Sequence, residues 1–247
     1  MDDLLVETAV QFEESTYRYI IGIDLGTTNS AVAFVDLAQH PSGAHYPAIQ
    51  TLAIPQLVGP GEMGQRSVLP SFLYLPGPYD LPPGGAALPW APTRDYIVGE
   101  FAREQGARVP GRLVASAKSW LAHAGVDRTA SILPWGAAAE IPQVSPVEAS
   151  KRYLQHIRES WNVQMAAGQE AAQLESQLVV LTVPASFDEV ARELTLTAAR
   201  QAGIPRVILL EEPLAAFYAW LAQEAQPDRE LSAKLQAGQL ILVCDVG

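Results

Sequence analysis

A carboxylate, a glycine and two hydroxyls lie close together near the start of the chain and could bind a phosphate and a metal ion. An apolar run is followed there by Asp24, Gly26, Thr27 and Thr28. Glycine lets the backbone turn sharply and approach a ligand, amides and hydroxyls can point at phosphate oxygens, and a carboxylate can hold hydrated magnesium. A second apolar run, residues 31–35, follows directly, so the turn is predicted to join two strands of a hairpin. The alternative is a surface turn with a solvated aspartate, because short motifs also occur by chance.

Acidic residues also follow two later predicted strands, as Glu212 and Asp245. In an open α/β sheet, ligands bind outside the carboxyl ends of the strands. Together with Asp24, these carboxylates could therefore surround one magnesium–phosphate site. Gly247 follows Asp245 at the spacing that separates Gly26 from Asp24, which indicates the start of a second phosphate turn.

Other kinds of chemistry find less support. The glycines of residues 59–64 resemble a dinucleotide-binding pattern, but a strand is predicted where a helix should begin, so we interpret this segment as a flexible loop. The four histidines lack the spacing of metal ligands, and the chain contains no Gly-x-Ser-x-Gly turn. The sequence therefore gives no basis for a zinc site or a serine hydrolase.

Composition narrows the class of protein. The 247 residues are 49% hydrophobic and carry a formal net charge of -11, which argues against partners such as nucleic acid or an anionic membrane. Cys244 is the single cysteine, so a reducing compartment, the cytoplasm, is expected. Residues 1–17 lack the apolar core of a signal peptide and are predicted to form a flexible acidic tail.

The elements that must position these groups follow an α/β pattern. Apolar runs at 178–183, 207–210 and 240–243 are predicted strands separated by helices. Asp188 is expected to cap the first of these helices and Gly203 to end it. Continuous apolar strands indicate a sheet covered on both faces. Glu211 is interpreted as a solvated residue.

Two other segments complete the predicted organisation. Ser145, followed by proline and then Glu148, forms a capping box that opens a long helix. Between residues 55 and 142 the composition changes to many prolines and glycines, most of all at 76–92, which predicts a small inserted α+β subdomain. Within it, strands are expected near 68–75 and 96–98, and helices near 100–106 and 113–123.

Five short motifs, taken together, resemble one family. They are residues 20–30, Leu69-Pro70-Ser71, Ala117-Lys118, Val183-Pro184-Ala185-Ser186-Phe187 and Glu212-Pro213-Leu214-Ala215-Ala216. They resemble the nucleotide-binding domain of the seventy-kilodalton heat-shock chaperones, within the actin-like ATPase superfamily. The resemblance implies an actin-like, ribonuclease H-like lobe: a mixed sheet flanked by helices, with the core in 18–54 and 143–247 and the insertion in 55–142.

The resemblance implies that the ligand is ATP or ADP with magnesium. The nucleotide-binding residues would then be Gly26, Thr27, Thr28, Asn29 and Gly247, with the two threonines on the β- and γ-phosphates.

The resemblance also implies the roles of the charged residues. Asp24, Glu212 and Asp245 would organise magnesium, mostly through its waters, and the attacking water. Lys118 would position that water and stabilise developing charge. Such a set suits phosphoryl transfer, which depends on positioning and charge neutralisation. Without the resemblance, Lys118 would be interpreted as an ordinary surface lysine.

By the same resemblance, Pro184 and Arg192 would relay the nucleotide state to a peptide-binding domain. The partners implied are unfolded peptides and co-chaperones, in protein folding and the stress response. A second lobe and a peptide-binding domain are absent from these residues, and the chain is expected to continue beyond Gly247. The 247 residues alone are therefore expected to have little or no ATPase activity.

Two alternatives remain open at this point. Leu214 and Glu211 replace the threonine and asparagine usual in the chaperones, and there the sequence also resembles bacterial actin-like proteins that form nucleotide-dependent filaments. A small-molecule kinase of the same superfamily is the third possibility, although no acceptor pocket is evident.

Overall fold

A computed structural model of the chain describes residues 17–39, 48–224 and 238–244. The predicted acidic tail, apart from Tyr17, lies outside the described residues. So do Asp245 and Gly247, the two residues predicted to begin a second phosphate turn.

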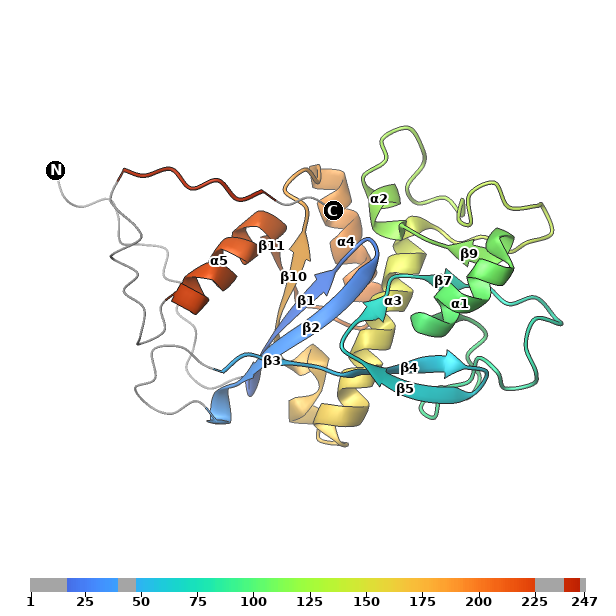
Figure 1. Cartoon of the computed structure of the whole chain (residues 1–247), viewed down its shortest axis with the longest axis horizontal. Helices are drawn as coiled ribbons and strands as arrows, with labels where there is room; N and C mark the ends of the chain where they lie inside the picture. Colours follow the sequence, from blue (N-terminus) through green and yellow to red (C-terminus); the bar gives the residue numbers. More distant parts are fainter. Residues whose placement is uncertain (1–16, 40–47, 225–237, 245–247) are drawn as a thin grey trace.

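A mixed sheet forms the centre of the molecule (Figure 1). Its strand order is β11-β10-β1-β2-β3, and β6 also pairs with β2. Strand β1 pairs in parallel with β10 and antiparallel with β2, and β10 pairs in parallel with β11. The strands are β1 (Tyr19–Leu25), β2 (Asn29–Asp36), β3 (Gln50–Thr51), β6 (Leu69–Pro70), β10 (Leu178–Val183) and β11 (Ile208–Glu211).

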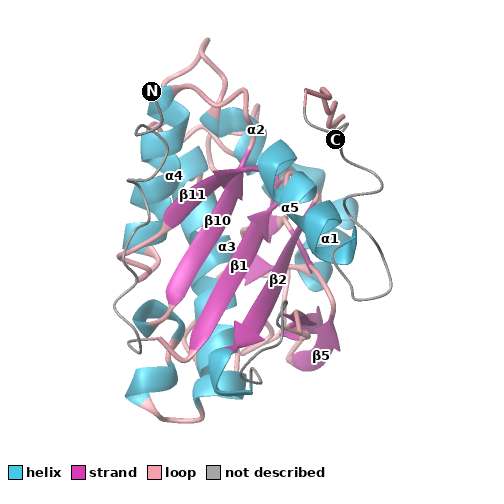
Figure 2. Ribbon diagram, turned by 90° about the vertical axis from the view of Figure 1, so that its left-hand side faces the viewer, coloured by secondary structure: helices cyan, strands magenta, loops and turns pink. Residues whose placement is uncertain are grey.

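Helices flank this sheet on both faces, as predicted (Figure 2). Helices α3 (Pro146–Trp161) and α4 (Glu189–Gln201) lie behind the sheet in that view, and α5 (Glu212–Glu224) lies in front. The predicted caps are confirmed: the Ser145 hydroxyl accepts a hydrogen bond from the Glu148 amide at 3.0 Å. Asp188 Oδ1 accepts one from the Ala191 amide at 2.7 Å.

Aromatic packing fixes α3 on the sheet. The rings of Tyr19 and Phe34 meet Trp161 edge to face, each with its centroid 5.1 Å from that of Trp161. Buried Trp161 also donates from Nε1 to the Ala172 carbonyl oxygen at 3.0 Å. Its one polar atom is therefore satisfied, and the large ring can fill the core.

Residues 54–121 form two small sheets and two helices beside this layer. Leu57, Tyr74, Ile97 and Phe101 build a second buried cluster there. The elements are β4 (Ile54–Gly59), β5 (Glu62–Arg66), β7 (Leu73–Tyr74), β8 (Ile97–Val98), β9 (Leu113–Val114), α1 (Glu100–Arg108) and α2 (Ala117–Leu121). Short 3₁₀ turns cover Leu37–Gln39, Pro110–Arg112, Glu170–Ala172 and Leu174–Ser176, and a π-helical turn covers Asn162–Ala166.

Two predictions of secondary structure are wrong. The glycines of residues 59–64 turn the β4–β5 hairpin, in which Gly59 pairs with Glu62, and do not form a flexible loop. Residues 240–243 are apolar but form no strand. A strand requires a neighbour that completes its hydrogen bonds, whereas Ile241 and Val243 instead line a cavity of about 320 Å³ with Phe217 of α5.

Two helical faces also differ from prediction. The spacing of apolar residues predicts Val190 on the buried face of α4, but Val190 is exposed, and the buried positions of that helix include Ala191 and Ala198. The same spacing predicts Leu214 and Tyr218 on the apolar face of α5, but both are exposed. An apolar residue type shows that a position can be covered, but not that a neighbouring element covers it.

The buried histidine of α3 predicts a pH-dependent stability. His156 Nε2 donates to the Pro55 carbonyl oxygen at 2.9 Å, and Nδ1 has no hydrogen-bond partner among the described residues. Burial, and then the nearby positive charge of Arg94, lowers the pKa of His156 to about 4. As pH falls from 6.5 to 4, His156 therefore binds a proton in the unfolded chain but stays neutral in the folded chain. We expect this to lower the free energy of unfolding by about 3 kcal/mol over that window.

Denaturant unfolding between pH 7 and pH 4 checks this expectation. His156→Gln should flatten the loss of stability, because glutamine does not titrate. His123→Gln is the matched control, since His123 is exposed and its ring nitrogen Nδ1 accepts a hydrogen bond from the Gly125 amide at 3.1 Å. Equal pH profiles for the native chain and His156→Gln would show that the buried ring is not the cause.

Candidate functional site

The β1–β2 turn places the predicted phosphate-binding residues at the surface. Leu25 pairs with Ser30 across the hairpin, so the turn contains Gly26, Thr27 and Thr28. A Cβ atom at position 26 would lie 2.1 Å from the Asn29 carbonyl oxygen. Only glycine fits this turn without a backbone shift, and both threonines are exposed.

Ser71 fixes the shape of the turn from the inserted region. Its hydroxyl donates to the Gly26 carbonyl oxygen at 2.7 Å, and its amide donates to the Thr28 carbonyl oxygen at 2.8 Å. A third contact joins its hydroxyl to that of Ser30 at 2.9 Å. Ser71 belongs to a motif noted in the sequence, but no role was predicted for it, because these bonds join residues more than 40 positions apart.

Asp24 lies at the exposed end of β1, next to the turn. Its Oδ1 accepts a hydrogen bond from the Thr182 hydroxyl of β10 at 2.8 Å. This bond orients the carboxylate, and no local pattern of residues predicts it. The strand register aligns Asp24 with Thr182 and Thr182 with Leu210. Glu212 begins α5 two residues beyond that row, so the structure places both acidic residues at the same end of the sheet.

Lys118 reaches Glu212 from a distant part of the sequence. The two residues are 94 positions apart, and the Lys118 Nζ atom donates to Glu212 Oε1. The Lys118 side chain is 6% exposed and that of Glu212 is 22% exposed. The pair brings Lys118 from residues 55–142 to Glu212, at the end of the sheet where Asp24 also lies. Figure 2 shows α2, the helix that carries Lys118, beyond the tips of β10 and β11.

The structure does not complete the predicted acidic ring. Asp245 and Gly247 lie outside the described residues, and within the described ranges no three His, Cys, Asp or Glu side chains gather as metal ligands. Asp24 and Glu212 are each held by another side chain at the same end of the sheet. The described part of the site is therefore a glycine-tightened turn, two carboxylates and one buried lysine.

The predicted relay residues also have defined contacts. Arg192 donates from Nη2 to Glu211 Oε1 at 2.8 Å and from Nε to the Phe187 carbonyl oxygen at 3.3 Å. The Phe187 amide in turn donates to the Pro184 carbonyl oxygen at 3.1 Å. The interpretation of Glu211 as merely solvated is wrong, because it is paired with Arg192. Glu211 directly precedes Glu212, so Arg192 contacts the segment that carries one of the site carboxylates.

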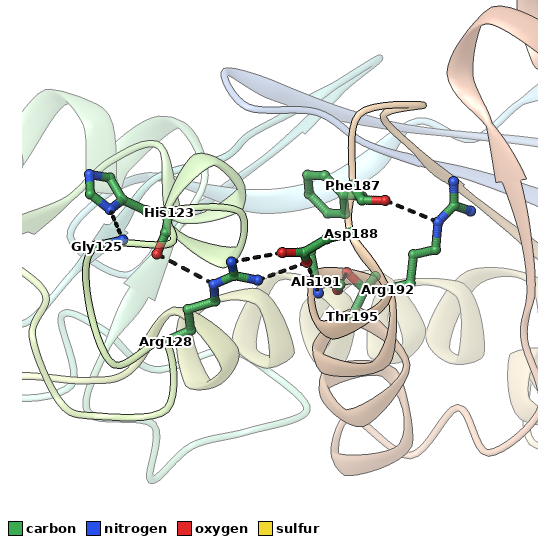
Figure 3. Close-up of polar contacts among 8 residues, drawn as sticks. All are labelled: His123, Gly125, Arg128, Phe187, Asp188, Ala191, Arg192 and Thr195. Atoms are coloured by element: carbon green, nitrogen blue, oxygen red, sulfur yellow. Dashed lines mark hydrogen bonds and ion pairs between the residues drawn. The ribbon is translucent and has the colours of Figure 1, made fainter.

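A further ion pair, which the sequence did not predict, joins the loop after α2 to α4 (Figure 3). Arg128 donates from Nη1 and Nη2 to the two carboxylate oxygens of Asp188, at 2.8 and 2.9 Å. Arg128 Nε also donates to the His123 carbonyl oxygen at 3.4 Å. These bonds from Arg128, and then the one from the Ala191 amide, lower the pKa of Asp188 to about 2. Asp188 was predicted as a helix cap, but nothing in the sequence around Arg128 marked its partner.

No helix of the described residues combines the length and the apolar character that crossing a membrane requires.

Comparison with known proteins identifies relatives of the chain. No family model matches it. It is 32% identical over 208 residues to "Chaperone protein HscA" of Enterobacter sp. (strain 638), a match that covers 82% of this chain and 28% of the relative. It is 34% identical over 214 residues to the HscA of Edwardsiella ictaluri (strain 93-146), covering 85% and 29%. It is 30% identical over 208 residues to that of Salmonella agona (strain SL483), covering 82% and 28%.

The chain thus spans less than a third of the length of these relatives. Within this chain, however, the matches cover more than four fifths of the sequence. The family is the one that the five motifs resemble: the chain belongs to the seventy-kilodalton heat-shock chaperones, as a bacterial-type member.

Proposed function

We propose that the chain is the first lobe of the ATP-binding domain of a heat-shock-type chaperone. The longer protein would hydrolyse ATP slowly and couple that reaction to the binding of unfolded peptide. The observation that carries this proposal is the pair between buried Lys118 and Glu212, formed across 94 positions of sequence at the end of the sheet that also holds Asp24. Burying a lysine removes its charge from water, which is costly, so buried lysines are usually paired with an opposite charge.

The residues of the turn fit a phosphate group. Because a Cβ atom at Gly26 would meet the Asn29 carbonyl oxygen, the backbone here has a shape that only glycine permits. Thr27 and Thr28 are exposed, and their amides and hydroxyls can then donate to phosphate oxygens. We assign Gly26, Thr27, Thr28 and Asn29 to nucleotide binding, with Gly247 as a further contact from the second turn.

The carboxylates fit a magnesium ion held through waters. Asp24 is exposed and oriented by Thr182, and carboxylate oxygens are ligands that magnesium accepts. We propose that Asp24, Glu212 and Asp245 hold the ion and that it neutralises phosphate charge when bound. Glu212 would also hold the attacking water, and Lys118 would donate to that water and to the developing charge.

The same proposal extends to the organisation of the protein. Residues 18–54 and 143–247 would form the core of an actin-like lobe, and residues 55–142 its inserted subdomain. A second lobe and a peptide-binding domain would complete the longer protein, and Pro184 and Arg192 would relay the nucleotide state to the peptide-binding domain. Its partners would be unfolded peptides and co-chaperones in the cytoplasm.

Nucleotide binding and single-turnover hydrolysis test this proposal. A chain extended through a second lobe should bind MgATP and hydrolyse it slowly, whereas the 247 residues alone should show little or no hydrolysis. Sedimentation with ATP is the matched control for a filament, and incubation with a sugar or acetate is the control for a kinase. Nucleotide-driven filaments or a phosphorylated acceptor would contradict the chaperone assignment, and failure to bind nucleotide would refute the site.

A further inference from the structure

The short helix that carries Lys118 has little to hold it within its own sequence. Helix α2 contains five residues, and its N-cap residue, Ser116, has a left-handed backbone and makes no side-chain capping bond. A helix of this length is not stable by itself. Ala117 and Leu121 are buried on its inner face. The segment that follows the helix requires a separate contact to hold it.

Arg128 supplies that contact. Its side chain is 10% exposed and reaches in two directions: Nε to the His123 carbonyl oxygen, just after α2, and both Nη atoms to Asp188 (Figure 3). A pair with two parallel hydrogen bonds fixes the relative orientation of its partners as well as their distance. The loop after α2 is therefore held on the first turn of α4.

Asp188 makes this anchor rigid, because the same carboxylate has two tasks. It caps α4 through the Ala191 amide and receives both Nη atoms of Arg128. An aspartate at an N-cap is already fixed in orientation by the helix it caps. Arg128 thus binds to a group whose position is set by a long helix packed on the sheet.

The contacts form a closed path between α2 and α4. At one end, Lys118 binds Glu212; the adjacent Glu211 binds Arg192 of α4. At the other end, Arg128 joins the loop after α2 to the cap of the same helix. We propose that the Arg128–Asp188 pair positions Lys118 for its role in hydrolysis, an inference that rests on the proposed function of Lys118.

Lysine labelling of the 247-residue chain tests the positioning without any need for activity. The sequence contains three lysines, Lys118, Lys151 and Lys234, so each can be followed by mass spectrometry. Arg128→Ala should raise the labelling rate of buried Lys118 several-fold and leave Lys151 unchanged. Lys151 is a suitable internal reference, because it pairs with Glu148 on α3 at 3.1 Å.

Three further variants separate the pair from a general loss of stability. Asp188→Asn keeps an acceptor that can cap the helix but removes the charge, and it should raise Lys118 labelling as Arg128→Ala does. Arg128→Lys should give an intermediate rate, because an ammonium group cannot form two parallel bonds. Arg200→Ala removes an exposed arginine of α4 that pairs with Glu193, and it should change neither lysine.

Hydrolysis by the extended chain supplies the second measurement. Arg128→Ala should lower kcat with little change in KM for ATP, and Arg128→Lys should recover part of the rate. Unchanged Lys118 labelling in both Arg128→Ala and Asp188→Asn would overturn the inference, as would an equal rise at Lys118 and Lys151. If Lys118→Ala itself hydrolyses ATP normally, the proposed function fails, whereas the labelling result still reports on the pair.

Discussion

Alanine at position 118 is expected to lower the single-turnover rate of ATP hydrolysis by the extended chain about 100- to 1000-fold. Removal of one preorganised donor from a site of developing charge has costs of this order in other enzymes. Lys118 is suited to that role, because its side chain is 6% exposed and its Nζ atom is already held by Glu212. A charge held in place before the reaction needs no reorganisation during it.

The design of this experiment separates chemistry from folding. Lys118→Ala should leave the affinity for MgATP within a few-fold, since the phosphate-binding turn does not include Lys118. Lys118→Met retains most of the apolar stem and should be as inactive as the alanine variant, with a smaller loss of stability. Lys151→Ala, which removes a partly exposed lysine of α3, should hydrolyse ATP at the native rate. A native rate for Lys118→Ala would refute the assigned role.

Alanine at position 26 is expected to damage both stability and nucleotide binding. Its Cβ atom would lie 2.1 Å from the Asn29 carbonyl oxygen, and a backbone atom cannot move away as a flexible side chain could. Overpacking of this kind costs about 1–3 kcal/mol, which denaturant unfolding of the 247-residue chain can measure. Because the turn must change shape, the affinity of the extended chain for MgATP should fall by more than tenfold. A tenfold loss corresponds to about 1.4 kcal/mol of binding free energy.

Gly22→Ala is the matched control for this variant. Gly22 lies in β1, the strand that leads into this turn, but a Cβ atom there would meet only the Ala33 carbonyl oxygen at 3.8 Å, an ordinary contact. We therefore expect Gly22→Ala to bind MgATP normally and to have a denaturant midpoint of unfolding close to that of the native chain. If the two alanine variants behave alike, the shape of the turn at Gly26 is not what the ligand requires.

Features that are decided by neighbouring residues could be predicted from the sequence. The hairpin at Gly26, the helix caps at Ser145 and Asp188, and the left-handed glycine that ends α4 at Gly203 all depend on groups a few positions apart. The physical rules for turns and caps act at that range. These features could therefore be assigned from residue type and spacing.

Features that depend on contacts between distant segments, or on whether a neighbouring element covers an apolar residue, could not be predicted from the sequence. Thr182 bonds Asp24, Arg192 bonds Glu211 and Arg128 bonds Asp188, and none of these polar pairs follows from local pattern. For apolar residues the error ran the other way: the strand expected at 240–243 has no neighbouring strand in the described residues. Hydrophobicity shows what a segment could bury, whereas the fold decides whether a partner is present.

The pairing of β1 also has a consequence for synthesis on the ribosome. One side of β1 pairs with β2, which follows it directly, but the other side pairs with β10, which lies 158 residues later at Thr182 and Asp24. A hairpin forms in about 1–10 μs, whereas translation at about 5–20 residues per second takes roughly 8–30 s to reach β10. During that interval one edge of an apolar strand lacks its neighbour and can pair with other nascent chains.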